Sequence, residues 1–432
     1  MMSIAYNILL AAAALVLGPY YGAKMLFSGK YRNSIGPKLG FTPAETFDAM
    51  EGTPRIWVHA VSVGEVTAAA PIVASLRQLF PGACIVLSTS TETGQEMARK
   101  FVRSATALFY YPLDIPCVIR KTLDRVAPDV FVAVETEIWP NFIRLCGQRG
   151  IGIALVNGRI SPRSFRGYGR TKFFWEAFFN RIDQIGAISE TDAARLQKLG
   201  VESSRVRVLG NAKYDGLAAS VSDELRDETS RRLNVSPDVP VLVAGSTHEG
   251  EESVVLSVYR ELLKEFPGLL LIVVPRHVER SADVIAQARK AGFDDVIAFS
   301  DIQAGTGRKT QRVIIIDVIG ELFKVYGLAT AVFCGGSLVP RGGQNILEAA
   351  AWGKVVLYGP SMEDFQDERE ALERVGAGIT VRNRGEMLDA LVQLMRHPDL
   401  LSEAGERARA MVAANTGASR RHAELIRSVL ER

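Results

Sequence analysis

Acidic side chains that follow predicted strands are the first candidates for chemistry in this sequence. Glu65 ends the segment HAVSVGE, residues 59–65, which comes directly after a run typical of a strand at residues 55–60. The turn places Glu65 in the first turn of a predicted helix at the carboxyl edge of a sheet, where clefts form. A carboxylate there could accept the proton of an attacking hydroxyl group. The alternative is a glutamate that only complements the helix dipole.

A second acidic segment, ETEIWPN at residues 135–141, follows a predicted strand at residues 130–134. Glu135 and Glu137 are two residues apart, so in an extended segment both side chains point the same way and Thr136 points the opposite way. An active-site role and an ion pair with a basic residue both fit this spacing. The alternative is a capped helix whose Trp139 packs on the core.

Basic residues in the first half are candidates for holding a negative charge. Lys213 follows a predicted strand at residues 205–209 and could bind a substrate carboxylate or a leaving phosphate, although a single lysine is usually a surface residue. Four arginines are interleaved with aromatic residues in a predicted loop at residues 157–170. This basic segment indicates either a solvated face or a contact with an anionic lipid surface.

In the second half, a predicted strand at residues 330–334 runs through the turn Gly335-Gly336-Ser337 towards a predicted helix at residues 346–352. Small residues let a ligand approach the backbone, and the unpaired N–H groups of a first helical turn favour an anion. Glu348, in that helix, could accept hydrogen bonds from a ribose diol. The pattern predicts a site for a sugar nucleotide.

Other strand ends in the second half carry further candidate ligands for a nucleotide. Ser246 or Thr247 would cap the next helix and offer N–H groups to a phosphate. The Arg276 side chain is a cation directed towards the cleft, and residues 317–322 leave backbone groups free to hydrogen-bond with a nucleotide base. His248 has no second metal ligand at a useful spacing, so zinc is not expected.

The composition argues against several classes of protein. A net charge of +3 over 432 residues is too small to indicate nucleic acid as the main partner. The four cysteines are scattered with no Cys-x-x-Cys pair, which argues against zinc and a disulfide framework and suits a reducing compartment. No Gly-x-Gly-x-x-Gly follows a strand, and neither a Walker lysine loop nor the nucleophile elbow of a Ser–His–Asp hydrolase is present.

These candidates lie in two successive α/β patterns. Short β-branched runs alternate with helical stretches between residues 55 and 210, and the pattern starts again at residue 240. Such alternation predicts parallel strands joined by crossover helices, with ligands outside the carboxyl ends of the strands. We therefore predict two doubly wound Rossmann-like domains facing each other across a cleft, residues 27–215 and residues 216–432. The hinge belongs near the start of the charged, strand-poor residues 215–240.

The first 23 residues contain no charged side chain, and Lys24, Lys30, Arg32 and Lys38 follow. An apolar run of this length can span a bilayer with its positive flank on the cytoplasmic side. A signal peptide or a core helix is the alternative, but no basic region precedes the apolar run. The sequence thus predicts a single-pass anchor over residues 1–26 that holds the catalytic domains on the cytoplasmic side of the cell inner membrane.

Five motifs in one order resemble the 3-deoxy-D-manno-octulosonic acid (Kdo) transferases of lipopolysaccharide biosynthesis, glycosyltransferase family 30. The motifs are HAVSVGE, ETEIWPN, STHEGEE, VPRH and GGSLVPRGG, and the similarity extends from the N-terminal segment to beyond residue 360. The resemblance implies a GT-B fold and a metal-independent, inverting transfer of Kdo from CMP-Kdo to the lipid A precursor, lipid IVA. CMP-Kdo is then a donor substrate, and no separate cofactor is expected.

The resemblance also implies roles for individual residues. Glu65 matches the general base, and Glu135 and Lys213 match positions that stabilise the transition state. The residues that match the CMP-binding segments are Pro275, Arg276, Ile319, Gly320, Glu321, Asn345, Ile346, Leu347 and Glu348. The family usually has His in place of Gln344 and a Gly-Pro-His stretch where this chain has GPSM, residues 359–362. Gln can donate and accept hydrogen bonds but carries no charge.

Two other hypotheses are kept beside this one. A GT-B transferase or epimerase that uses a UDP-sugar would prefer UDP to CMP. A membrane-tethered protein that binds a sugar nucleotide without turnover would be expected to carry a degraded Glu65 segment, and that segment is intact here.

Overall fold

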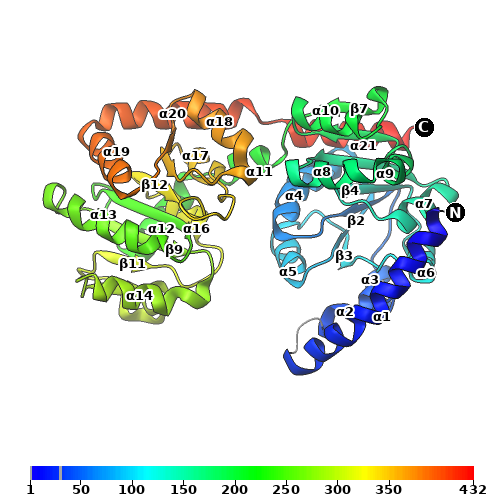
Figure 1. The fold of residues 1–432 in the computed structure, drawn as a ribbon, viewed down its shortest axis with the longest axis horizontal. Coiled ribbons are helices and arrows are strands. Elements are labelled where there is room, and N and C mark those ends of the chain that lie inside the picture. The colour runs from blue at the N-terminus through cyan, green and yellow to red at the C-terminus, as the bar shows by residue number, and fades with distance from the viewer. Residues whose placement is uncertain (1, 29–31) are drawn as a thin grey trace. The chain divides into compact units, whose positions relative to one another are not determined.

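The computed structural model describes residues 2–28 and 32–432, which form two compact units (Figure 1). The first unit runs up to Gly216 and also contains residues 415–432, whereas the second contains residues 217–414. Within the described residues, each unit has one seven-stranded sheet whose paired strands are all parallel. The α/β class and the two doubly wound sheets that the GT-B prediction requires are therefore confirmed.

The sheet of the first unit has the strand order β3-β2-β1-β4-β5-β6-β7. Its strands are β1 (Arg55–His59), β2 (Cys84–Thr89), β3 (Ala107–Tyr110), β4 (Val130–Val134), β5 (Gly152–Gly158), β6 (Gln184–Ala187) and β7 (Val206–Val208). The central strands are almost continuously apolar because both of their faces are covered by helices. The strand order reverses between β1 and β4, and ligands of doubly wound sheets bind at the carboxyl end of such a point.

Helices cover both faces of this sheet. One face packs on α4 (Val63–Leu79), α5 (Glu92–Phe101) and α21 (Ala418–Leu430). The other packs on α6 (Pro116–Val126), α7 (Pro140–Gln148), α8 (Pro162–Arg170), α9 (Lys172–Phe179) and α10 (Glu190–Lys198). Trp57 lies at the centre of this second face, with its ring 5.0 Å from Phe142 and 5.7 Å from Phe131 between centroids, and its indole N–H donates to Ser88.

The sheet of the second unit has the order β10-β11-β9-β8-β12-β13-β14 and reverses between β8 and β12. Its strands are β8 (Val241–Thr247), β9 (Leu270–Pro275), β10 (Val296–Ala298), β11 (Val313–Ile315), β12 (Ala331–Cys334), β13 (Val356–Tyr358) and β14 (Gly378–Thr380). Its helices are α12 (Asp223–Leu233), α13 (Glu251–Glu265), α14 (Ser281–Lys290), α15 (Phe299–Asp301), α16 (Leu322–Tyr326), α17 (Leu347–Ala351), α18 (Gln366–Arg374), α19 (Arg384–Arg396) and α20 (Pro398–Ala414).

Shorter elements and the linking helix complete the two units. They are α2 (Arg32–Lys38), α3 (Glu45–Asp48), α11 (Lys213–Ser220) and the single turns Ser203–Arg205, Val278–Arg280, Ile302–Thr306 and Glu363–Phe365. The predicted hinge region is therefore largely helical, as α11 and α12. The predicted basic loop is also helical, because Pro162 occupies the first turn of α8 and the Ser161 hydroxyl accepts a hydrogen bond from the Ser164 N–H.

The last helix belongs to the first unit, so the prediction that residues 216–432 form one domain is wrong for residues 415–432. The apolar side of α21, which includes Leu425 and Ile426, is buried in the core formed with α4. The Asp215 carboxylate accepts hydrogen bonds from the N–H groups of Gly417 and Ser419 at the start of α21. A composition-based boundary cannot detect such a return of the chain.

The N-terminal helix α1 (Met2–Ser28) makes polar contacts with the rest of the first unit. The Tyr6 hydroxyl donates to Asp114 at 2.9 Å, and the side chains of Asn7 and Asn141 hydrogen-bond each other. Among the residues that the structure describes, no helix has both the length and the apolar character needed to cross a bilayer. The predicted single-pass anchor is thus not supported.

The position of α21 predicts which unit a core mutation destabilises. Ile426→Ala should lower the free energy of unfolding of the first unit by about 2–5 kcal/mol, because a fully buried isoleucine leaves a cavity. Amide hydrogen exchange should accelerate in β1 and α4 but not in β8. Leu391→Ala, equally buried in the second unit, is the matched control and should accelerate exchange in β8 alone. Unchanged exchange in β1 for Ile426→Ala would contradict the packing of α21.

Candidate functional site

The switch point of the first unit brings three carboxyl groups to one edge of the sheet. Glu65 follows β1, and Glu135 and Glu137 follow β4, the neighbouring strand. Both acidic segments that the sequence singled out therefore lie at the position where a doubly wound sheet binds its ligand.

Glu65 lies in the first turn of α4 with its side chain only 9% exposed. One carboxyl oxygen accepts the N–H of Val61 at 2.7 Å, and the other accepts the Ser62 hydroxyl at 3.0 Å. Burial is the main cause that raises the pKa of Glu65 to about 8. The hydrogen bond from Val61 lowers that pKa, and the charges of Glu137 and Glu135 raise it. A carboxyl group with a pKa near the working pH is suited to general base catalysis.

Glu135 is paired with Lys213. The Lys213 ammonium lies 2.8 Å from a carboxylate oxygen of Glu135. Glu135 has a φ of +61°, a left-handed conformation that costs a non-glycine residue about 1–3 kcal/mol, so the segment is not extended as the two-residue spacing suggested. The Thr136 hydroxyl donates to the carbonyl of Arg159. The predicted ion pair with a basic residue is confirmed.

Among the described residues, no cation forms an ion pair with Glu137. Its carboxyl group lies close enough to Glu65 to affect the pKa of Glu65. The pKa of Glu137 is raised to about 7, mainly by burial and also by the charge of Glu135, whereas the Trp139 side chain lowers it. The charge of Glu137 raises the pKa of Glu65, so the protonation of these two carboxyl groups is linked.

Asn157, which the sequence patterns did not single out, positions Lys213. Its buried side-chain carbonyl accepts the Ala212 N–H at 2.8 Å, and the Asn211 side chain accepts the Lys213 N–H at 3.0 Å. Asn157 has a φ of +51°, and asparagine before glycine at a strand end is a signal for such a turn.

His59, in the same motif as Glu65, is structural. Its ring stacks on Tyr111 at 3.8 Å and is completely buried, and burial lowers the pKa of His59 to about 3. The imidazole is therefore neutral at physiological pH and is not an acid–base partner of Glu65.

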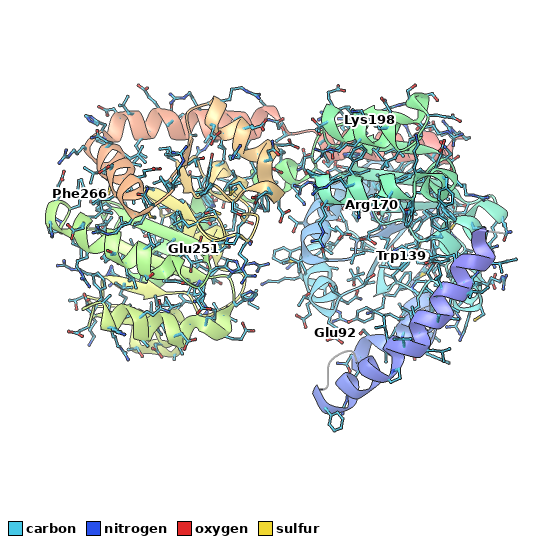
Figure 2. All side chains as sticks on the ribbon, viewed as in Figure 1. Glu92, Trp139, Arg170, Lys198, Glu251 and Phe266 are labelled. Carbon is cyan, nitrogen blue, oxygen red and sulfur yellow. The ribbon has the colours of Figure 1, made fainter. Side chains whose placement is uncertain are left out.

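The switch point of the second unit is occupied by the protein's own carboxylate. Glu251, which begins α13 (Figure 2), is 1% exposed and accepts hydrogen bonds from the N–H groups of His248, Gly336, Ser337 and Leu338 at 2.7–3.0 Å. The anion expected at the glycine turn is thus the side chain of Glu251. These N–H groups are not available to a phosphate.

The predicted capping role of Ser246 or Thr247 is wrong. Helix α13 begins at Glu251, and its N-cap is Gly250, which makes no side-chain cap. Ser246 instead has a left-handed φ of +53° at the end of β8, and Thr247 is fully buried.

The structure brings three residues of the candidate donor site together: Arg276, Asn345 and Glu348. The Asn345 amide donates to a Glu348 carboxyl oxygen at 3.1 Å. Burial raises the pKa of Glu348 to about 7, whereas the Asn345 hydrogen bond and the charge of Arg276 lower it, so Arg276 lies near this carboxyl group. The backbone N–H of Arg276 donates to the Thr247 carbonyl at 3.0 Å, and this hydrogen bond holds the ends of β8 and β9 together.

The other predicted donor residues have different surroundings. Pro275 ends β9, and Ile346 and Leu347 have buried side chains, so only their backbone can face a ligand. Ile319 is 81% exposed next to Gly320, whose φ is +94°. The Glu321 carboxylate is already paired with Arg232 at 3.3 Å and Lys324 at 2.9 Å. Within the described part of the chain, no group of three or more His, Cys, Asp or Glu side chains could hold a metal ion.

Residues 33–216 match the family described as 3-deoxy-D-manno-octulosonic-acid transferase (kdotransferase). A 3-deoxy-D-manno-octulosonic acid transferase of Haemophilus influenzae is 32% identical over 99% of this chain and 98% of its own length. One of Bordetella pertussis is 31% identical over 85% of each chain. A crystal structure of UDP-GlcNAc 2-epimerase from Neisseria meningitidis shares the fold, with a TM-score of 0.61 at 16% identity over 86% of this chain and 99% of its own.

Fold and sequence together define the class of the protein, a glycosyltransferase built from two doubly wound α/β units. The chain belongs to the 3-deoxy-D-manno-octulosonic acid transferase family. The family resemblance of the five sequence motifs is therefore confirmed.

The coupled carboxyl pair predicts a specific pH dependence. A base works only when deprotonated, so kcat/KM should rise with pH up to about 8 in the wild-type protein. Glu137→Gln removes a like charge beside Glu65, lowers the pKa of Glu65 and should move this rising limb to lower pH. Glu96→Gln, an exposed charge change in the same unit, should leave the limb in place. A limb unmoved by Glu137→Gln would show that Glu65 and Glu137 are not coupled.

The Glu251 cluster predicts a stability effect in the second unit. Glu251→Gln replaces one acceptor oxygen by an NH₂ group facing backbone N–H donors, which should lower the free energy of unfolding by roughly 2–4 kcal/mol. Urea denaturation would measure this change. Glu249→Gln, exposed in the same turn, is the control and should change stability by less than about 0.5 kcal/mol. Equal stability of both variants would exclude the proposed role of Glu251.

Proposed function

We propose that the protein transfers Kdo from CMP-Kdo to the lipid A precursor lipid IVA with inversion at C2 of Kdo. The observation that supports this most strongly is the buried Glu65 carboxyl group at the switch point, with its pKa raised to about 8. Family membership supports the choice of Kdo as the transferred sugar. The sugar acceptor would bind at the edge where Glu65 lies.

The reaction is a single displacement. The Glu65 carboxylate takes the proton of an acceptor hydroxyl group as the hydroxyl oxygen bonds to C2 of Kdo. The bond between C2 and the phosphate oxygen of CMP breaks on the opposite face, and CMP leaves with the bonding electrons. C2 carries positive charge in the transition state, and inversion follows from the opposite positions of the attacking and leaving oxygens. General base assistance of this kind typically contributes ~10²–10⁴-fold.

Lys213 and Glu135 would act on the charge of the transition state. Their ion pair, with a 2.8 Å separation, holds the ammonium at the carboxyl edge beside Glu65. An ammonium there can neutralise the carboxylate of Kdo or negative charge on the departing phosphate. Glu135 orients the ammonium, and the ion pair neutralises the charge of the Glu135 carboxylate.

CMP would be bound by the second unit. Arg276 provides an exposed guanidinium for the phosphate, and Glu348, oriented by Asn345, accepts hydrogen bonds from the ribose hydroxyls. Ser246, Pro275, Ile319, Gly320, Ile346 and Leu347 would contribute backbone or surface contacts. Glu321 would shape this region through its ion pairs rather than bind CMP directly.

The proposed acceptor is a lipid, so the protein would work at the cytoplasmic face of the inner membrane. Exposed cations on α8 are suited to an anionic lipid surface. The proposed chemistry uses no metal ion, because the charges of Lys213 and Arg276 take the role that a bound cation has in other transferases.

A second candidate function is a reaction on a UDP-sugar, which the fold shared with UDP-GlcNAc 2-epimerase favours. Thermal unfolding separates the two. CMP should raise Tm more than UDP at equal concentration if the donor is CMP-Kdo, since a ligand stabilises the state it binds. A larger shift with UDP would support the second candidate.

The test of the first proposal is transfer of radiolabelled Kdo from CMP-Kdo to lipid IVA. Wild-type protein should form the labelled product, and Glu65→Gln should reduce kcat ~10²–10⁴-fold while binding CMP with unchanged affinity. Gln keeps the shape of Glu65, its carbonyl can still accept the Val61 N–H, and its amide can donate to the Ser62 hydroxyl, so Tm should not fall. Glu96→Gln should keep full activity. Near-normal kcat in Glu65→Gln would exclude Glu65 as the base, and absence of any transfer by wild-type protein would exclude this function.

A further inference from the structure

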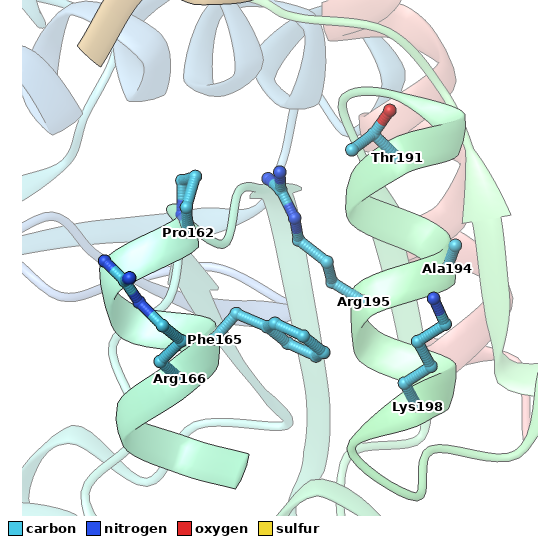
Figure 3. A pocket seen from close by; sticks show the side chains of 7 residues that line it. All are labelled: Pro162, Phe165, Arg166, Thr191, Ala194, Arg195 and Lys198. Atoms are coloured by element: carbon cyan, nitrogen blue, oxygen red, sulfur yellow. The ribbon is translucent and has the colours of Figure 1, made fainter. Parts of the chain in front are cut away.

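The first unit has a second candidate binding site between α8 and α10 that the proposed mechanism does not use. A pocket of about 550 Å³ opens between these two helices (Figure 3). Its lining has an apolar part and a cationic part: Pro162, Phe165 and Ala194, and Arg166, Arg195 and Lys198. In Figure 3 the side chains of Phe165 and Arg195 extend into the space between the helices.

The positive charge of this pocket is largely uncompensated. No acidic side chain lines it. Within the described residues, the side chains of Arg166 and Lys198 take part in no hydrogen bond or ion pair. Arg195 donates to the Ile160 carbonyl at 2.7 Å and lies 3.7 Å from Asp192, whose buried carboxylate also accepts the Ile160 N–H. The fixed Arg195 and the two free cations therefore favour an anion with more than one negative charge.

The chemistry of the lining favours a phosphate attached to a larger apolar or sugar group. A carboxylate would be balanced by one cation, whereas a phosphate monoester carries up to two charges and three acceptor oxygens. Guanidinium groups match phosphate geometry with paired hydrogen bonds. The Phe165 ring and the neighbouring Pro162 and Ala194 leave an apolar wall for the part of the ligand next to the phosphate.

Helix α8, which forms one wall of the pocket, is linked to the acidic edge of the sheet. Helix α8 starts four residues after β5, and the Thr136 hydroxyl donates to the Arg159 carbonyl just before that start. On α8, burial raises the pKa of Tyr168, and the charge of Glu137 contributes, so Tyr168 lies within electrostatic range of one carboxyl group of this edge. Phe165 and Arg166 of the same helix line the pocket. Helix α8 thus contributes both to the pocket and to the surroundings of Glu137, which shares its sheet edge with Glu65.

We propose that the pocket between α8 and α10 binds a phosphate group of the glycolipid acceptor and so positions its reacting hydroxyl group. The inference rests on the proposed function, because it concerns the acceptor of that reaction. A concave pocket favours one acceptor molecule over the surface of a bilayer, for which Arg163 and Arg170, the exposed cations of α8 that do not line the pocket, would suffice.

The test compares two variants with the same change of charge. Arg166→Gln/Lys198→Gln removes the two free cations of the pocket. Arg163→Gln/Arg170→Gln removes two exposed cations of α8 that do not line it. All four side chains are on the surface, so both variants should fold. The acceptors are lipid IVA and lipid IVA whose phosphates have been removed with a phosphatase.

The pocket variant should raise KM for lipid IVA roughly tenfold with kcat nearly unchanged, because charge-assisted contacts to the acceptor are lost. It should also bind phosphorylated and dephosphorylated lipid IVA equally, whereas wild-type protein and the control variant should prefer the phosphorylated form. An equal rise of KM in both variants, or a preserved preference in the pocket variant, would overturn the inference.

Two further measurements distinguish acceptor binding from binding of bulk phospholipid and from failure of the transfer reaction itself. Binding to phosphatidylglycerol vesicles should weaken equally in both variants; weakening confined to the pocket variant, with KM unchanged, would assign the pocket to bulk phospholipid and overturn the inference. Equilibrium binding of lipid IVA in detergent does not require turnover. If wild-type protein transfers no Kdo, the proposed function fails, while loss of the phosphate preference in the pocket variant still supports this site and its retention overturns it.

Discussion

Crowding of carboxyl groups in a poorly hydrated place is the constraint on which the first unit depends. Glu65 is held by the Val61 N–H and the Ser62 hydroxyl, which fix its orientation but do not offset its burial and its two acidic neighbours. The protein compensates one of the three carboxylates with Lys213 and leaves the other two competing for a proton. This arrangement keeps a weakly acidic group in place for proton transfer, and the left-handed backbone of Glu135 is part of its cost.

The two units use the same topological position in opposite ways. In the first, the carboxyl group at the switch point has few donors and a raised pKa, which suits reactivity. In the second, Glu251 receives four backbone N–H groups and becomes a fixed part of the scaffold. Because Glu251 fills the glycine turn, the groups left to meet a nucleotide are Arg276, Asn345 and Glu348. One unit is thus suited to change charge during a reaction, and the other to remain constant.

How much of the structure can be predicted from the sequence depends on whether the residues that determine a feature are close together or far apart along the chain. Alternating apolar strands and helices are local patterns, so the two sheets and the edges carrying Glu65, Glu135 and Arg276 could be predicted. The sequence predicts a loop in place of α8 because Gly167 and Gly169 weaken its helical pattern, although Pro162 is a helix-start signal. The contacts of Glu251 with residues 336–338 and of α21 with the first unit join segments more than 80 residues apart, and no local pattern encodes them. The roles of the site residues in catalysis are still predictions.

The chain crosses from the first unit to the second and then returns with α21, and this order matters during synthesis. Residues 415–432 are synthesised after the whole second unit, so the unit begun first lacks one wall of its interior until they have emerged from the ribosome. The unit made second is continuous in sequence and has no such delay. A nascent chain therefore exposes the apolar surface of α4 for most of its time on the ribosome, which makes that surface a natural substrate for chaperones and a point at which premature termination leaves an aggregation-prone product.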